Sequence, residues 1–346
     1  MYINFMIEEN KNTYISYWLL LITFLVSLMI IVGGLTRLTD SGLSITKWEL
    51  FSGILPPISL EDWESSFSLY KKIPEYTLLN SSMTLDQFKT IYWWEYIHRL
   101  LGRLVGLIYL IPLLYFTYKK YIKGKFLISL YTILILIILQ GFIGWYMVQS
   151  GLTERTDVSH YRLALHLILA FIIFILLVWN YLKYKKPEFL IRGEKIPFYL
   201  PLFFIISVLI QICIGAFVSG LDAGQIYQSW PLMNENYFPD DSNVKILFST
   251  QIFEIPSIVQ FIHRNIAYLI IIFFIFITFI VYKNNNLKYL RRTVNLILVM
   301  IFIQTFLGIL TILSGAQIAL ASMHQIGSIF LVTLSVILLF QNSKIN

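Results

Sequence analysis

The stretch EYIHRLLGR, from Glu95 to Arg103, carries four ionisable side chains inside an otherwise apolar run. Charged groups are costly in hydrocarbon, so ionisable residues in such a run indicate a functional site. On a helix, Glu95 and His98 share a face, and Arg99 lies one turn beyond Glu95. A similar stretch, QFIHR, begins at Gln260 and keeps the histidine and arginine but has an amide in place of the acid. The pair predicts a duplicated helical protein whose halves differ by one acid.

The composition indicates a polytopic membrane protein. Of 346 residues, 58% are hydrophobic and 13% are charged, and the mean hydropathy is +0.73. A spanning helix needs about 20 apolar residues. Eight stretches meet this requirement: 14–36, 91–118, 126–148, 159–182, 198–219, 259–282, 293–313 and 321–341. We therefore predict an all-α membrane protein with eight transmembrane helices.

The distribution of charge predicts the orientation of these helices. The connections 119–125, 183–197 and 283–292 hold 13 Lys and Arg and two Glu, whereas the other four hold seven basic and fourteen acidic residues. By the positive-inside rule, the first three connections and both termini are cytoplasmic, in a bacterial cytoplasmic membrane. The net charge of +7 then reflects orientation and contact with membrane lipid, so no nucleic-acid partner is needed. The single cysteine, Cys213, excludes an internal disulfide and a thiolate metal cluster.

Internal repeats divide the chain into two halves. At an offset of 182 residues, Gly33, Asp40 and Gly42 match Gly215, Asp222 and Gly224. At an offset of 164, Gln140 and Gly144 match Gln304 and Gly308. At an offset of 158, His166 matches His324. We predict two pseudo-symmetric four-helix bundles, 1–190 and 191–346, related by an axis along the membrane normal. The long outer loop 37–90 belongs to the first half. Within it, Ser59-x-x-Asp62 and Thr84-x-x-Gln87 predict helix starts, the first for an amphipathic helix on the membrane surface.

The histidines of the predicted spans suggest a metal cofactor. His98, His166, His263 and His324 all lie on even-numbered spans, which start at the outer face, so we expect two histidines per half in the outer leaflet. Two imidazoles from facing helices are the usual way to hold a haem iron on both sides. Zinc also takes histidines, but the second half offers no carboxylate or thiolate partner. A packing role for each single histidine remains the alternative.

The neighbouring charged residues fit a haem site. Arg99 and Arg264 each adjoin a candidate ligand, and a guanidinium fork suits a haem propionate. Snorkelling of these long side chains toward water is the alternative. Because Glu95 lies beside only one of the four histidines, we expect the first half to handle protons and substrate and the second to hold a fixed cofactor. A structural hydrogen bond from Glu95 to a neighbouring histidine or arginine is the alternative.

Several further motifs, taken in order, resemble the haem A synthase family. They extend from about Gly33 to Ser328 and comprise GGLTRLTDSGLS from Gly33, MTL from Met83, EYIHR from Glu95, YRLALH from Tyr161, DAG from Asp222, WPLM from Trp230 and IHR from Ile262. The absence of cysteine from loop 37–90 resembles the proteobacterial and mitochondrial branch. The resemblance implies that His98 and His166 flank the iron of a substrate haem O, that His263 and His324 ligate the iron of a haem b, and that Glu95 is the catalytic carboxylate.

The implied activity is oxidation of a ring methyl of haem O to the formyl group of haem A, by successive hydroxylations with water as the oxygen source. Candidate partners are haem O and haem A, haem O synthase, cytochrome oxidase assembly factors and a second copy of the chain. The alternative function is a dihaem cytochrome with bis-histidine ligation that transfers electrons from quinol. A transporter ranks last, because the polar residues cluster in the outer leaflet rather than along a path at mid-membrane.

Overall fold

The computed structural model describes residues 2–47, 52–153, 155–185 and 194–343, with side chains from residue 13 onward. All regular secondary structure in these ranges is helical, and eight helices within them are long and apolar enough to cross a membrane. These are α1 (Tyr2–Leu38), α4 (Leu85–Tyr118), α5 (Gly124–Gln149), α6 (His160–Lys185), α7 (Tyr199–Gly220), α8 (Pro256–Lys283), α9 (Arg291–Leu313) and α10 (Ile318–Asn342). The predicted fold class and the eight spans are confirmed.

Local sequence signals explain several helix ends. Thr84 caps α4 through a capping box with Gln87, so this helix starts at Leu85 as predicted. Pro256 occupies the first turn of α8, where the missing N–H removes no helical hydrogen bond. The first predicted span, 14–36, is confirmed, and the helix α1 that contains it begins earlier, at Tyr2. Its spanning portion is Thr13–Leu38. The polar segment before residue 13 therefore continues the helix rather than ending it.

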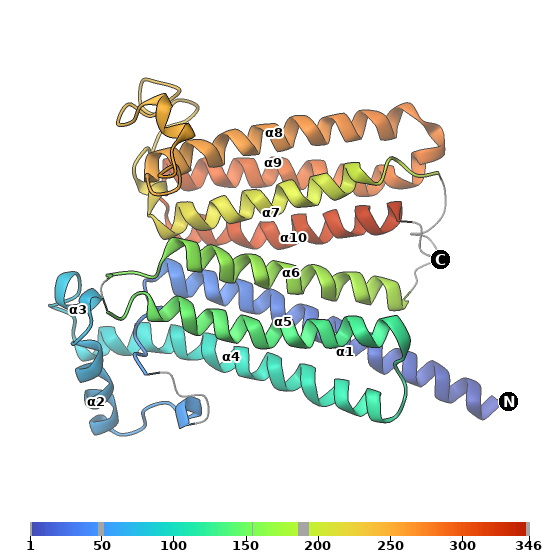
Figure 1. The fold of residues 1–346 in the computed structure, drawn as a ribbon, viewed down its shortest axis with the longest axis horizontal. Helices are drawn as coiled ribbons and strands as arrows, with labels where there is room; N and C mark the ends of the chain where they lie inside the picture. The colour runs from blue at the N-terminus through green and yellow to red at the C-terminus, as the bar shows by residue number, and fades with distance from the viewer. Residues whose placement is uncertain (1, 48–51, 154, 186–193, 344–346) are drawn as a thin grey trace.

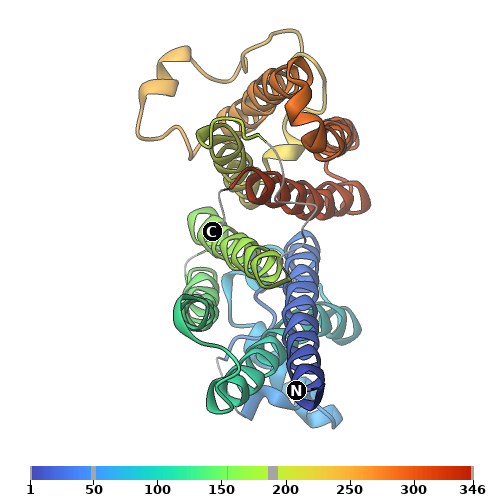
Figure 2. The same cartoon turned by 90° about the vertical axis from the view of Figure 1, so that its right-hand side faces the viewer.

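The helices form two groups that lie side by side (Figures 1 and 2). In the first group α1 and α5 each pack against α4 and α6, and in the second α7 and α9 each pack against α8 and α10. Between the groups, α1 packs against α10, and α6 packs against α7 and α10. One apolar cluster of buried residues runs through both groups. The predicted division at 190/191 lies outside the described residues, and the two-bundle organisation remains a prediction.

The connections between helices separate by length and charge. At one end of the molecule, Figure 1 shows the long connections with α2 (Leu60–Tyr70), α3 (Pro74–Leu78) and the loop between α7 and α8. That end also holds the short 3₁₀ helices η1 (Ser52–Ile54), η3 (Ala223–Gln225) and η4 (Val244–Phe248). The opposite end holds the basic connection between α4 and α5, the one between α8 and α9 with η5 (Asn285–Leu290), the start of α1 and the end of α10. The first end is called the outer end below.

The outer loop of the first group folds onto α4. Ser59 caps α2 through the predicted capping box with Asp62. We expected the apolar side of this helix to rest on the membrane surface. In the structure Trp63 and Phe67 of that side are buried. Trp63 packs edge to face with Tyr92 of α4, and Phe67 stacks on Phe88 of α4. The loop therefore packs against the protein and covers the outer end of α4.

Candidate functional site

The four predicted histidines form two pairs of the same geometry. His98 on α4 faces His166 on α6 with ring centres 6.5 Å apart and planes at 69°. His263 on α8 faces His324 on α10 with ring centres 6.5 Å apart and planes at 78°. The two helices that carry a pair both pack against the other two helices of their group, so they lie diagonally across that group. The structure therefore brings together the residues that the sequence assigned to each half.

A glycine on a neighbouring helix makes room for each ring. A Cβ added to any of these glycines would lie 3.0 to 3.2 Å from the ring that it faces, closer than an ordinary van der Waals contact. The facing pairs are Gly33 with His98, Gly144 with His166, Gly215 with His263 and Gly308 with His324. Both halves use glycines at repeated positions. The repeated glycines, which the sequence analysis noted only as markers of duplication, thus have a structural reason.

The geometry of the pairs fits a haem iron. An iron bound on both sides at about 2 Å by imidazole nitrogens leaves the ring centres roughly 6 Å apart. All four histidines are only half-buried. The Nδ1 atoms of His263 and His324 are buried without a hydrogen-bond partner. Within the described ranges no group of three or more His, Cys, Asp or Glu side chains could hold a metal ion, which argues against the zinc alternative.

Glu95 lies in a tight polar contact with the outer loop. Its carboxylate is 2% exposed and accepts hydrogen bonds from Ser44 Oγ and from the backbone N–H of Ile45, both at 2.7 Å. Arg99 donates to its other oxygen from Nε at 3.0 Å and from Nη2 at 2.6 Å. Both carboxylate oxygens are therefore engaged. These contacts match the structural role that the sequence left open for Glu95, and they also fix the acid one turn from His98.

The arginines beside the histidines hold loop carbonyls. Arg99 donates to the carbonyl oxygens of Ile45 at 2.8 Å and Lys47 at 3.2 Å. Arg264 donates to the carbonyl oxygens of Tyr227 at 3.1 Å and Leu232 at 3.3 Å, while its buried Nε has no partner. The sequence assigned both arginines to haem propionates, and that role remains a prediction. Each arginine thus holds the outer loop of its own half, and the arginine together with its carbonyl acceptors is called a clamp below.

Glutamines that the sequence analysis did not assign to the site also contact the histidines. Gln140 on α5 donates from Nε2 to the carbonyl of His166 at 3.0 Å, and Gln211 on α7 donates to the carbonyl of His263 at 2.9 Å. Both amides lie within 3.3 Å of a ring nitrogen of the same histidine. The amides therefore lie beside the rings, and the one from Gln211 approaches Nε2 of His263. For Gln140, the repeat match with Gln304 was a feature of the sequence that could have predicted its place in the site.

Comparison with known proteins shows the family to which the chain belongs. Residues 16–336 match the family described as "Cytochrome oxidase assembly protein". The "Heme A synthase" of Pelagibacter ubique is 49% identical over 351 residues, covering 99% of this chain and 100% of that protein. The chain belongs to the haem A synthase family. The "Heme A synthase" of Rickettsia bellii is 44% identical over 92% of the chain and 95% of that protein, and that of Rickettsia africae is 42% identical over 94% and 96%. The family predicted from the order of motifs is confirmed.

One ionic cluster of this haem A synthase family member was not predicted. Arg37, at the outer end of α1, pairs with Asp40 at 2.7 Å, Asp157 at 2.9 Å and Asp222 at 3.0 Å, and donates to the carbonyl of Ser219 at 2.8 Å. Burial raises the pKa of Asp157, and the charge of Arg37 opposes that shift. The cluster links the two helix groups. Asp40 and Asp222, a repeat pair, both have left-handed backbone conformations, with φ of 48° and 49°.

The fifth histidine is also placed differently from the expectation. We expected His160, at the start of α6, to be a polar residue at the membrane interface. It is 2% exposed, with its ring 4.2 Å from that of Tyr161 and its Nε2 3.8 Å from Glu254. Gly220 packs against it. His160 is therefore a buried packing residue between α6 and α7, apart from both histidine pairs.

Proposed function

We propose that this protein oxidises a ring methyl of haem O to the formyl group of haem A for cytochrome oxidase assembly. Similarity to heme A synthases over nearly the whole chain carries the proposal. Its site is the His98–His166 pair, beside the acid of the first half. Haem O and haem A are then substrate and product, and a multi-pass membrane protein is a suitable setting for such apolar molecules.

The two histidine pairs have different roles in this proposal. His98 and His166 hold the substrate haem, and His263 and His324 hold a haem b. The matched 6.5 Å separations and the facing glycines support both assignments. A bound haem b supplies a one-electron carrier. Arg264, whose buried Nε has no partner, is the better candidate for a propionate contact, because Arg99 is already neutralised by Glu95.

The acid acts by its charge. Four donors hold the Glu95 carboxylate in one orientation, which leaves it poorly placed to take up a proton. Although Arg99 balances its charge overall, the carboxylate end of this ion pair is a fixed negative pole that stabilises positive charge developing at the methyl carbon during oxidation. Two successive hydroxylations, each using one water and releasing two electrons and two protons, give a gem-diol, and loss of one water from it gives the formyl group. The protons leave through other groups of the first half.

The outer end of the molecule faces the periplasm in this proposal. The basic connections, the start of α1 and the end of α10 lie at the opposite end (Figure 1). The positive-inside rule then assigns that opposite end to the cytoplasmic side of a bacterial inner membrane. Haem O synthase, cytochrome oxidase assembly factors and a second copy of the chain remain candidate partners.

The test is a pigment analysis. The protein is expressed in a bacterium that makes haem O but no haem A, and extracted haems are separated by chromatography. Haem A is expected with the wild-type chain and is expected to be absent from cells without it. The alternative function, a quinol-oxidising cytochrome with two bis-histidine haems, gives two redox-active haems with ordinary substituents and no new pigment. That result would reject the proposal.

A further inference from the structure

A second buried acid lies outside the site described above. Glu75, on the short helix α3 of the first outer loop, is 5% exposed. Its Oε1 is 3.5 Å from Asn80 Nδ2, whereas its Oε2 is buried and has no hydrogen-bond partner in the described structure. A buried carboxyl oxygen without a partner is costly for a purely structural residue. It indicates a group that exchanges a proton.

The surroundings of Glu75 favour its protonated form without fixing it. Burial and the carboxylates of Asp157, Asp40 and Glu95 raise the pKa of Glu75 to about 8, and the neighbouring Tyr70 hydroxyl opposes this shift. Asp157 and Asp40 are themselves paired with Arg37. A carboxyl group with this pKa changes its charge close to physiological pH. It can therefore take up and release protons during turnover.

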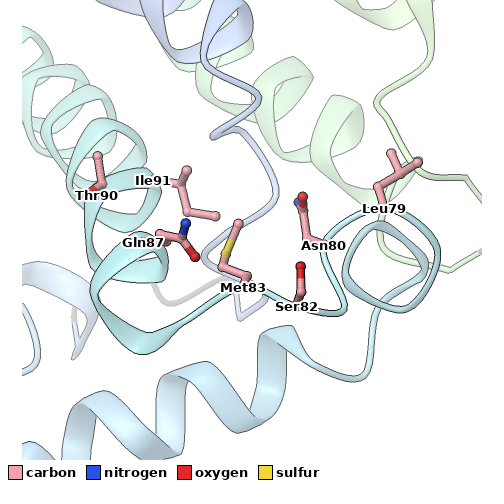
Figure 3. Close-up of a pocket in the computed structure, with 7 residues that line it drawn as sticks. All are labelled: Leu79, Asn80, Ser82, Met83, Gln87, Thr90 and Ile91. Carbon is pink, nitrogen blue, oxygen red and sulfur yellow. The ribbon is translucent and has the colours of Figure 1, made fainter.

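A surface pocket lies beside Asn80, the residue that approaches Glu75. Figure 3 shows Asn80 and Ser82 on one side of it and Gln87 and Ile91 on the other, with Met83 between them. Leu79 and Thr90 complete the lining, and Leu79, Ser82, Gln87 and Thr90 are exposed. The pocket therefore opens at the outer end of α4.

Two residues that line this pocket, Asn80 and Ile91, make hydrogen bonds toward the two acids. On one side, Asn80 Nδ2 donates to the hydroxyl of Tyr70 at 2.9 Å and approaches Glu75. On the other side, the carbonyl of Ile91 accepts from Ser44 Oγ at 3.3 Å, and the same hydroxyl lies 2.7 Å from Glu95. Each acid is thus linked through hydrogen bonds to one residue that lines the pocket.

We propose that Glu75 relays protons from the first-half site to the outer aqueous phase through the pocket beside Asn80. The inference rests on the proposed function, since oxidation of a methyl group releases protons that the fully engaged Glu95 does not accept. The carboxylate of Glu75 takes one proton on Oε2 and becomes the neutral acid. It then returns that proton to water in the pocket, with no electron transfer at this residue.

The test compares Glu75→Gln with Glu61→Gln, which removes an exposed acid from the same loop. Haem A formation is measured from pH 6 to 9 on membranes with equal bound haem. Because the carboxylate form of Glu75 increases as pH rises, the wild-type and Glu61→Gln rates are expected to rise through an inflection near pH 8. Glu75→Gln is expected to lose the inflection and about tenfold in rate at pH 8. Acetate, a small diffusible acid, is expected to restore part of that rate, which a purely structural role would not allow.

The outcomes separate the two proposals. If the wild-type chain makes no haem A, the proposed function fails. If it makes haem A, and Glu75→Gln keeps both its rate and its pH profile, only the relay is rejected. If Glu75→Gln loses its haem absorbance, the variant Ser82→Trp tests the relay instead. Ser82 is exposed at the mouth of the pocket, so a tryptophan there is expected to obstruct the pocket without disturbing the fold. A severalfold slower rate with full haem content is then expected, and an unchanged rate overturns the relay.

Discussion

The two halves of the molecule build the same clamp but give it different charges. Arg99 donates to the carbonyl of Ile45 and Arg264 to the carbonyl of Tyr227, and these acceptors are 182 positions apart, like Gly33 and Gly215. In the first half Glu95 neutralises the arginine, with 2.6 Å between Oε1 and Nη2.

In the second half the acid is replaced by Gln260, which donates to the carbonyl of Tyr227 at 3.1 Å. Its amide adds no charge, so the second clamp keeps a net positive charge while the first is neutral. A positive clamp suits a permanently held anionic cofactor, and a neutral one suits a substrate that must leave.

The largest effect is expected from removing the charge that distinguishes the halves. Glu95→Gln makes the first clamp resemble the second, and it is expected to lower haem A formation about 100-fold, because a fixed charge at the reacting carbon is lost. Bound haem is expected to stay. Pigment extraction gives the rate, and Gln260→Glu in the second half is the matched variant, expected to weaken haem retention at the second pair rather than to act at the reacting carbon.

Next in size is the difference in haem retention between the pairs. His324→Ala is expected to remove the proposed haem b, because it would lose one of the two histidines assigned to its iron. His98→Ala is expected to leave that haem in place. Haem per polypeptide after purification measures both. Equal loss of haem from the two variants would contradict the division into a substrate site and a cofactor site.

A smaller effect is expected at the glycines that face the rings. Gly308→Ala places a Cβ 3.2 Å from His324, and Gly144→Ala places one 3.0 Å from His166, so each ring must shift. We expect Gly308→Ala to weaken haem b retention about tenfold and Gly144→Ala to slow haem A formation without loss of haem b. Gly141→Ala, on the same helix as Gly144, meets nothing within 4 Å and is expected to match wild type in both assays.

The smallest effect is expected at the cluster that joins the halves. Arg37→Gln removes three ion pairs whose acidic partners are 38% to 74% exposed, so solvent screening reduces their contribution. We expect a loss of about 1–2 kcal/mol in stability, seen as a lower thermal midpoint in detergent, because Arg37 itself is largely buried. The histidine pairs lie within single groups, so haem content is expected to be unchanged at low temperature.

Much of the fold and the histidine pairs could be predicted from the sequence because helical periodicity and repeats fix them. The position of a residue along a helix determines the side of the helix that it faces. The internal repeat then assigned two histidines to each half, His98 with His166 and His263 with His324. The Thr84 and Ser59 capping boxes fixed helix starts for the same local reason.

The contacts made by the loops could not be predicted. The donors of Glu95 come from residues 44 and 45, more than 50 positions away in one case, and the partners of Arg37 come from three separate connections. Burial of Glu75 depends on how α2 and α3 fold back over α4. No periodic pattern records such tertiary packing.

Electron paramagnetic resonance of the purified, oxidised protein loaded with haem tests the central claim most directly. Two unlike histidine-ligated sites predict two low-spin signals, one removed by His98→Ala or His166→Ala and the other by His263→Ala or His324→Ala. Glu95→Gln is expected to shift only the first. A single signal, or loss of both signals from any one histidine variant, would contradict the account.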